Sequence, residues 1–182
     1  MKRISLVVTI ALLVGCETPA SVPGTPTSQT WLCGREYVNH AWGYQRRGVV
    51  FDVSGTVLKY ELRGGGNSST RPWSPNDMSR LTEADLKQRY AGAMASGQKI
   101  PAADITEHLP LVETASQATP SKPQMTAADM GQHLTYCYTY DEKAKIYSQV
   151  MIDNRGDWTS TNPSAAARKL AQWIERAIGT EP

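Results

Sequence analysis

The three cysteines, at positions 16, 33 and 137, have the widest chemical scope of any residues in this chain. A thiol can accept an acyl group, form a disulfide, bind a metal ion or attack a substrate. The chain contains no C-x-x-C or H-x-x-x-H spacing, so we expect no metal site and no metal cofactor. The residues around each cysteine decide between the other possibilities.

Cys16 directly follows a short apolar segment. Two basic residues begin the chain after Met1, residues 4–14 form an apolar run, and Gly15 is a small residue. The run is too short to span a bilayer, which takes about 20 apolar residues. We therefore expect residues 1–15 to be a signal peptide.

The residues Leu13, Val14, Gly15 and Cys16 resemble the lipobox of bacterial lipoprotein signals. The resemblance implies cleavage before Cys16, diacylation of its thiol and acylation of the new amino group. Two or more acyl chains hold a protein stably on a membrane, whereas one chain binds marginally. Two alternatives stay open: an ordinary secretory signal with an incidental cysteine, and an apolar segment that remains part of the domain.

The residue after the lipidated cysteine bears on which membrane would hold the protein. In the lipoproteins of enteric bacteria, an Asp at this position favours retention in the inner membrane. This chain has Glu17 there. The resemblance therefore implies a lipid-anchored protein of the cell envelope, with the outer membrane favoured over the inner one.

Cys33 and Cys137 remain as an even pair, which in an exported protein predicts a disulfide. We then expect their Cα atoms to lie about 4.4 to 6.8 Å apart. The competing interpretation is a nucleophilic thiol that works with His40 or His133. An oxidising compartment favours the disulfide, because it pairs free thiols.

Charge and composition divide the chain into a tether and one domain. Of 19 basic residues, Lys2 and Arg3 leave with the signal, so 17 remain against 17 acidic residues. This balance, without a basic cluster, argues against a nucleic-acid partner. The lipidated Cys and a Pro-, Thr- and Ser-rich tether occupy residues 16–29, and residues 30–182 form a single globular domain.

Alternating apolar residues predict two β-hairpins. One joins residues 49–53 to 58–62 through Ser54 and Gly55, and the other joins residues 134–141 to 146–152. Helices are expected from Thr82, from Pro101 with a break or bend at Pro110, and from Asn162-Pro163 to Gly179. This order predicts an α+β domain of two layers, an antiparallel sheet from two hairpins covered on one face by about three helices.

The region around the first hairpin carries a second resemblance. The run Asn39-His40-Ala41-Trp42-Gly43-Tyr44, with Gly48, Asp52, Gly55, Val57 and Tyr60, resembles the opening hairpin of uncharacterised exported bacterial domains. Those domains have no established activity, so the resemblance implies no function.

Aromatic residues suggest where a partner would bind. Tyr136, Tyr138 and Tyr140 share one face of a strand, and we expect them in the core, because a sheet face under helices needs bulky apolar side chains. Trp73 lies in a polar loop rich in Gly and Ser, and Trp42 lies before the first hairpin. Trp73 and Trp42 are therefore the candidate contact residues.

Two classes of function follow. The first is a non-catalytic binding or interaction domain, held to the membrane by lipid and contacting an envelope protein or glycan, without a cofactor. The alternative is an anchored hydrolase whose dispersed site draws on His40, His133, Asp52 and Asp141. Catalytic triads are recognised by geometry, so their mutual positions discriminate between the two classes.

Overall fold

The computed structural model describes residues 28–41, 43–63 and 78–179, which contain three helices and eight strands. No helix within these ranges is long and apolar enough to cross a membrane. In chain order the elements are β1 (Trp31–Asn39), β2 (Gln45–Asp52), β3 (Thr56–Arg63), α1 (Glu83–Arg89), β4 (Met94–Lys99), α2 (Ala102–Ser116), β5 (Gln124–Met125), β6 (Gln132–Asp141), β7 (Ile146–Gly156), β8 (Trp158–Thr161) and α3 (Ala165–Ile178).

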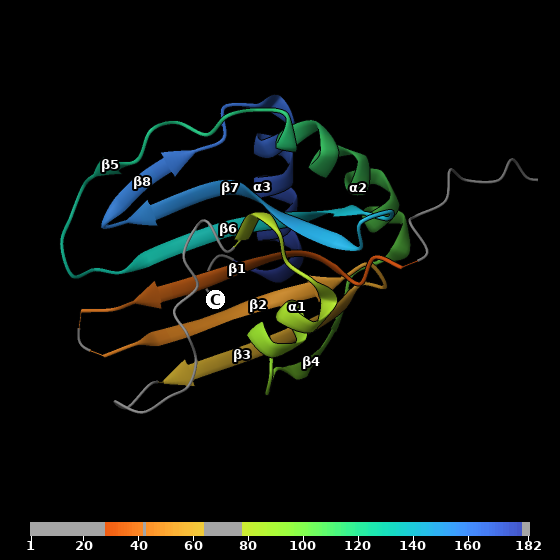
Figure 1. Cartoon of the computed structure of the whole chain (residues 1–182), viewed down its shortest axis with the longest axis horizontal. Helices are drawn as coiled ribbons and strands as arrows, with labels where there is room; N and C mark the ends of the chain where they lie inside the picture. Colours follow the sequence, from red (N-terminus) through yellow and green to blue (C-terminus); the bar gives the residue numbers. More distant parts are fainter. Residues whose placement is uncertain (1–27, 42, 64–77, 180–182) are drawn as a thin grey trace, which may run out of the picture.

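The strands form one antiparallel sheet in the order β4-β3-β2-β1-β6-β7-β8-β5. β1 comes first in the chain but lies inside the sheet, between β2 and β6 (Figure 1). β2 pairs with β3, and β6 pairs with β7, where the alternating sequence predicts strands. The antiparallel sheet of an α+β chain is thus present, and β1, β4, β5 and β8 add to it beyond the sequence prediction.

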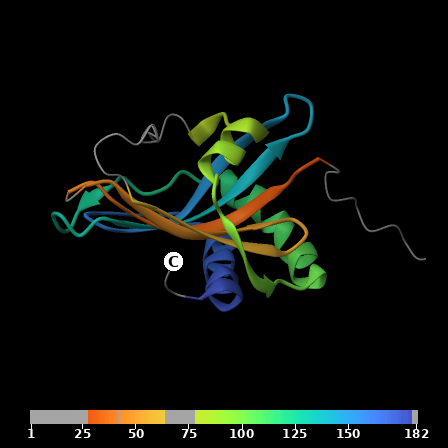
Figure 2. The ribbon, with the colours of Figure 1, turned by 90° about the horizontal axis from the view of Figure 1, so that it is seen from below.

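Helices lie on both faces of the sheet, whereas the sequence interpretation placed all three on one face (Figure 2). α2 and α3 pack over a core that includes Phe51, Cys137 and Trp173, on what we call the α3 face. Leu86 of α1 packs against Val50 on the opposite side, which we call the α1 face. Side chains alternate along a strand, so both faces of the central strands had apolar residues to cover.

The helix ends follow the sequence signals closely. Thr82 caps α1, and its side chain and that of Asp85 exchange hydrogen bonds with each other's backbone N–H groups, forming a capping box. α3 begins two residues later than expected, because the Ser164 hydroxyl, not the Asn162 side chain, accepts from the Ala167 N–H in the first turn, and Gly179 ends the helix. α2 continues through Pro110, where a break or bend was expected.

The tyrosine face of β6 is buried, as expected for the core. Tyr136 and Tyr138 are fully buried, and Tyr140 at the end of the strand is partly buried. Tyr136 lies opposite Gly34 of β1, and a Cβ atom there would approach the Tyr136 hydroxyl to 2.9 Å. The absence of a side chain at Gly34 therefore makes room for this ring.

Candidate binding site on the uncovered face of the sheet

Part of the α3 face extends beyond the helices that cover the rest of it (Figure 2). The strand register places five side chains from neighbouring strands in one row across this part, and four of them, all except Tyr37, are exposed. The complete row is Glu61, Arg47, Tyr37, His133 and Arg155. A polar and cationic surface thus takes the place of a helix at this end.

Tyr37 organises the middle of the row. The Arg47 guanidinium carbon lies 4.4 Å from the centroid of the Tyr37 ring, and the His133 ring centroid lies 4.9 Å away on the neighbouring strand. The Tyr37 hydroxyl donates to the Met130 carbonyl and accepts from the Asn39 side chain. The fixed ring attracts the guanidinium to its face and so limits the directions in which Arg47 can point.

A second row of side chains lies beside the first, on the side toward α3. Val49 on β2 lies opposite Arg35 on one side and Lys59 on the other. The Arg35 guanidinium donates to the Gly179 carbonyl at 2.6 Å, which joins β1 to the end of α3. Burial lowers the pKa of Arg35, and the nearby carboxylate of Glu175 opposes that effect.

A hollow of about 440 Å³ lies over this second row, between β2, β3, β4 and the end of α3. Val49, Met94 and Ile178 contribute apolar lining, and Arg47 and Lys59 contribute cationic lining. Ligand sites in proteins have volumes of about 300 to 1,000 Å³. The hollow is therefore large enough for a small ligand.

A buried ionic network on the α1 face holds the strands beneath this surface. Glu36 forms ion pairs with Arg46 of β2 at 2.8 Å and with Arg89 of α1 at 2.7 Å. The Tyr60 hydroxyl donates to the same carboxylate. Burial by itself raises the pKa of Glu36, but the charges of Arg89 and Arg46 and the Tyr60 hydrogen bond outweigh it and lower the pKa to about 2.

Four tyrosine hydroxyl groups continue from this network into the core. The Tyr60 hydroxyl lies 3.3 Å from that of Tyr136, which lies 2.9 Å from that of Tyr90. The Tyr90 hydroxyl in turn lies 2.7 Å from that of Tyr138. Burial raises the pKa of Tyr60, Tyr136 and Tyr138, so these groups stay protonated and act as hydrogen-bond donors. We interpret the network and the hydroxyl chain as structural.

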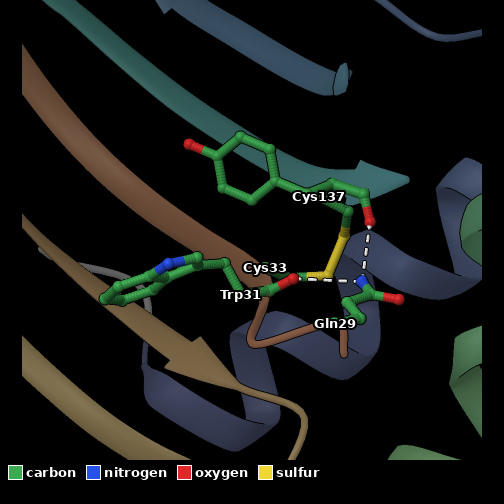
Figure 3. The surroundings of a disulfide bond; sticks show 5 residues. Gln29, Trp31, Cys33 and Cys137 are labelled. Carbon is green, nitrogen blue, oxygen red and sulfur yellow. Dashed lines mark hydrogen bonds between the residues drawn. A yellow bond between two sulfur atoms is a disulfide. The ribbon is translucent and has the colours of Figure 1, made fainter. Parts of the chain in front are cut away.

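Cys33 and Cys137 form a buried disulfide between β1 and β6, as the sequence predicts (Figure 3). Their Cα atoms lie 3.9 Å apart, below the expected range of about 4.4 to 6.8 Å, and the two residues lie directly opposite each other on paired strands. The Gln29 side chain donates to the carbonyl groups of Trp31 and Tyr138 beside the bond. The disulfide and Gln29 together fasten the beginning of the domain to the sheet.

The lipidation site and the two candidate contact residues from the sequence lie outside the described structure. Cys16, Trp42 and Trp73, together with the rest of the lipobox, lie outside the described residues. The lipidation and the two tryptophan contacts therefore remain predictions from the sequence.

The four residues considered for a hydrolase do not converge. His133 is the second residue of β6 and Asp141 is its last, and eight residues of strand span about 27 Å. Asp52 accepts hydrogen bonds inside the β2–β3 turn, and His40 packs against Tyr44 just beyond the opposite end of β1. The described part of the chain also holds no cluster of three or more His, Cys, Asp or Glu side chains suited to a metal ion.

The end of the sheet far from the disulfide exposes large apolar side chains. Met125 and Met130 are each 64% exposed and Trp158 is 46% exposed. Trp158 pairs with Met125, and the Met130 backbone N–H donates to Asp157, the neighbour of Trp158. Sequence reasoning missed this group, because short strands and loops of mixed composition give no periodic pattern.

Comparisons with known proteins add no relatives. No family model matches the chain, and no curated protein and no solved structure matches it. Its function must therefore be inferred from its own residues.

Proposed function

We propose that this chain is a lipid-anchored binding domain of the cell envelope, without catalytic activity, whose partner is an envelope protein or glycan. Cys16 carries the lipid, and the outer membrane is its favoured location. The sequence of Leu13 to Cys16 supports the anchor. The Cys33–Cys137 disulfide fits export to an oxidising compartment.

One observation carries the binding function: the two ends of the sheet differ in character. The chain enters the domain at Trp31, next to the disulfide and the Gln29 hydrogen bonds. From Cys33 to Asn39, β1 runs about 20 Å toward the opposite end. That far end carries the exposed Trp158, Met125 and Met130.

An exposed cluster of Trp and Met is typical of contact surfaces. Aromatic residues and Met are enriched at protein interfaces, and Met adapts its shape to different partners. Cationic Arg47 lies on the neighbouring uncovered face and adds charge selectivity, whereas Arg155 on the same face is paired with Asp153. The anchored end thus faces the lipid, and the far end is available to a partner.

The anchor is tested by mass spectrometry of the mature N-terminus and by membrane fractionation. The expected result is a mature chain that begins at a triacylated Cys16 and fractionates with the membrane. Cys16→Ser abolishes acylation and releases the protein from the membrane fraction. An uncleaved chain beginning at Met1, or a mature start beyond Cys16, would contradict the anchor.

The binding end is tested by photo-crosslinking in cells. A photoreactive residue in place of Trp158 should yield defined adducts with an envelope component, because this side chain is exposed at the far end. The same residue in place of exposed Thr114 on α2 is the matched control. Equal adducts from both positions, or none from position 158, would argue against the far end as the contact surface.

A further inference from the structure

We infer that the hollow beside Val49 binds an amphipathic anion, meaning a carboxylate or phosphate group attached to a short apolar body. The inference rests on the proposal that the chain is a binding domain, and it is independent of the lipid anchor. It concerns the α3 face near β4, whereas the crosslinking experiment addresses the opposite margin of the sheet at β5 and β8.

Two cations border the hollow without an anionic partner among the described residues. Arg47 contacts the Tyr37 ring but forms no ion pair with any described residue, and the same holds for the ammonium group of Lys59. They are diagonal neighbours on β2 and β3, about 7 to 8 Å apart at the backbone. Two like charges at this distance repel each other, so an anion placed between them is stabilised by both.

The acidic side chain at the hollow does not neutralise them. Glu61 lies opposite Arg47 in the register, but its carboxylate accepts from Arg63 at 2.6 Å. Arg35, on the other side of Val49, lies near the Glu175 carboxylate, so we do not count its charge toward the hollow. The hollow therefore carries a net positive charge, which selects anions over cations and neutral molecules.

The floor of the hollow favours a ligand that also has an apolar part. Val49 is buried beneath it, Ile178 closes the side toward α3, and Met94 is 74% exposed at the side toward β4. Contact with a ligand would remove the Met94 side chain from water, which stabilises the complex in proportion to the apolar area buried. An inorganic anion cannot make this contact.

Calorimetric titration of the full chain in phosphatidylcholine nanodiscs tests the inference, with empty nanodiscs as the blank. We expect octyl phosphate and octanoate to bind, and octyl glucoside and inorganic phosphate to bind at least about tenfold more weakly. Tighter binding of octyl phosphate than of octanoate identifies a phosphate ligand, and the reverse identifies a carboxylate ligand. Either order supports the inference.

Substitutions at the hollow locate the site. Arg47→Gln and Lys59→Gln should each weaken octyl phosphate binding about tenfold, because each removes a charge-assisted contact. Lys169→Gln, which removes an exposed cation about 14 Å along α3 from Ile178, should leave binding unchanged. Met94→Ser should weaken binding of octyl phosphate but not of methyl phosphate.

Several results would overturn the inference. One is binding of octyl glucoside or of inorganic phosphate that is as tight as binding of octyl phosphate. Another is binding of octyl phosphate by the Arg47→Gln and Lys59→Gln variants that is as tight as binding by the Lys169→Gln variant. Attachment to anionic vesicles without binding of any soluble probe would indicate a membrane surface instead. If these results appear while Trp158 still crosslinks, the proposed binding function stands and only the ligand assignment fails.

Discussion

The Glu36 carboxylate lies 2.8 Å from the Arg46 guanidinium, although each side chain is at most 4% exposed. Arg89 of α1 shares the same carboxylate at 2.7 Å. One buried acid thus joins two neighbouring strands and the only described helix of the α1 face. Buried charges are stable only while each keeps its oppositely charged partner, so we expect the fold to depend on the contacts among these three side chains.

Glu36→Gln should lower the free energy of unfolding at pH 7 by about 3 to 5 kcal/mol, the usual effect of removing one partner from a buried ion pair. The neutral amide leaves two buried arginines without their shared counter-ion. Equilibrium urea unfolding, followed by tryptophan fluorescence, measures the change. Glu113→Gln, at an exposed position on α2, is the matched control and should have little effect. A loss below about 1 kcal/mol for Glu36→Gln would contradict this role.

The same carboxylate predicts the acid sensitivity of the fold. Its pKa falls from 4.5 to about 2 on folding, so ionised Glu36 stabilises the native state above pH 4.5. That contribution is lost as the pH falls from 4.5 toward 2, and by linkage it is worth about 3 kcal/mol. Urea unfolding at pH 7, 4 and 2.5 should show the difference between wild type and Glu36→Gln shrinking with pH. A constant difference would show that the charge of Glu36 is not responsible.

The network also shows where sequence reasoning stops. Glu36, Arg46 and Arg89 are charged residue types that normally face water, and no local pattern indicates that they meet across 10 and 53 positions of sequence. Lys59 occupies a polar position of a predicted strand, and Arg47 lies two residues before the other predicted strand, so the sequence indicates their exposure but not the hollow. Arg47 and Lys59 lie around Val49 only because β2 pairs with β3 and the end of α3 packs beside these strands.

The strands that the sequence predicts are those in which apolar residues recur at every second position. Residues 49–53 and 134–141 carry bulky apolar residues at every second position, and residues 49–52 lie in β2 and residues 134–141 in β6. β1 could not be recognised, because both of its faces are largely buried and it includes Arg35 and Glu36. The side of the sheet on which α1 packs depends on tertiary contacts, which an apolar stripe alone does not reveal.

Tyr60→Phe should cost more stability than Tyr136→Phe. The Tyr60 hydroxyl donates to a carboxylate, and hydrogen bonds to charged groups contribute about 1.5 to 3 kcal/mol. Among the described residues, the Tyr136 hydroxyl forms hydrogen bonds only with the neutral hydroxyl groups of Tyr60 and Tyr90, so its loss should cost about 1 kcal/mol. Urea unfolding of both variants gives the order, and a larger effect at Tyr136 would reverse our ranking of the two bonds.

Gly48→Ala should destabilise the fold by about 1 to 3 kcal/mol, since it overfills a packed site. A Cβ atom there would lie 2.5 Å from the Arg35 carbonyl oxygen and 2.5 Å from the Tyr60 hydroxyl. Gly97→Ala is the comparison, because no atom lies within 4 Å and only its φ of +79° opposes alanine. In thermal unfolding, a milder loss at Gly48 than at Gly97 would contradict close packing of the Tyr60 ring over β2.

The Cys33–Cys137 disulfide should contribute about 4 to 5 kcal/mol to the free energy of unfolding, because it closes a loop of 104 residues in the unfolded chain. The double variant Cys33→Ala, Cys137→Ala removes this constraint. Its urea dependence should also become steeper, because an unlinked unfolded chain exposes more surface. Cys16→Ser leaves the pair intact and serves as the control.

Both sulfur atoms belong to fully buried residues, so dithiothreitol should reduce the wild-type chain much faster in urea than in buffer. Equal reduction rates in the two conditions would show that the disulfide opens without unfolding, and the N-terminal end of the domain would then be less firmly held than we infer.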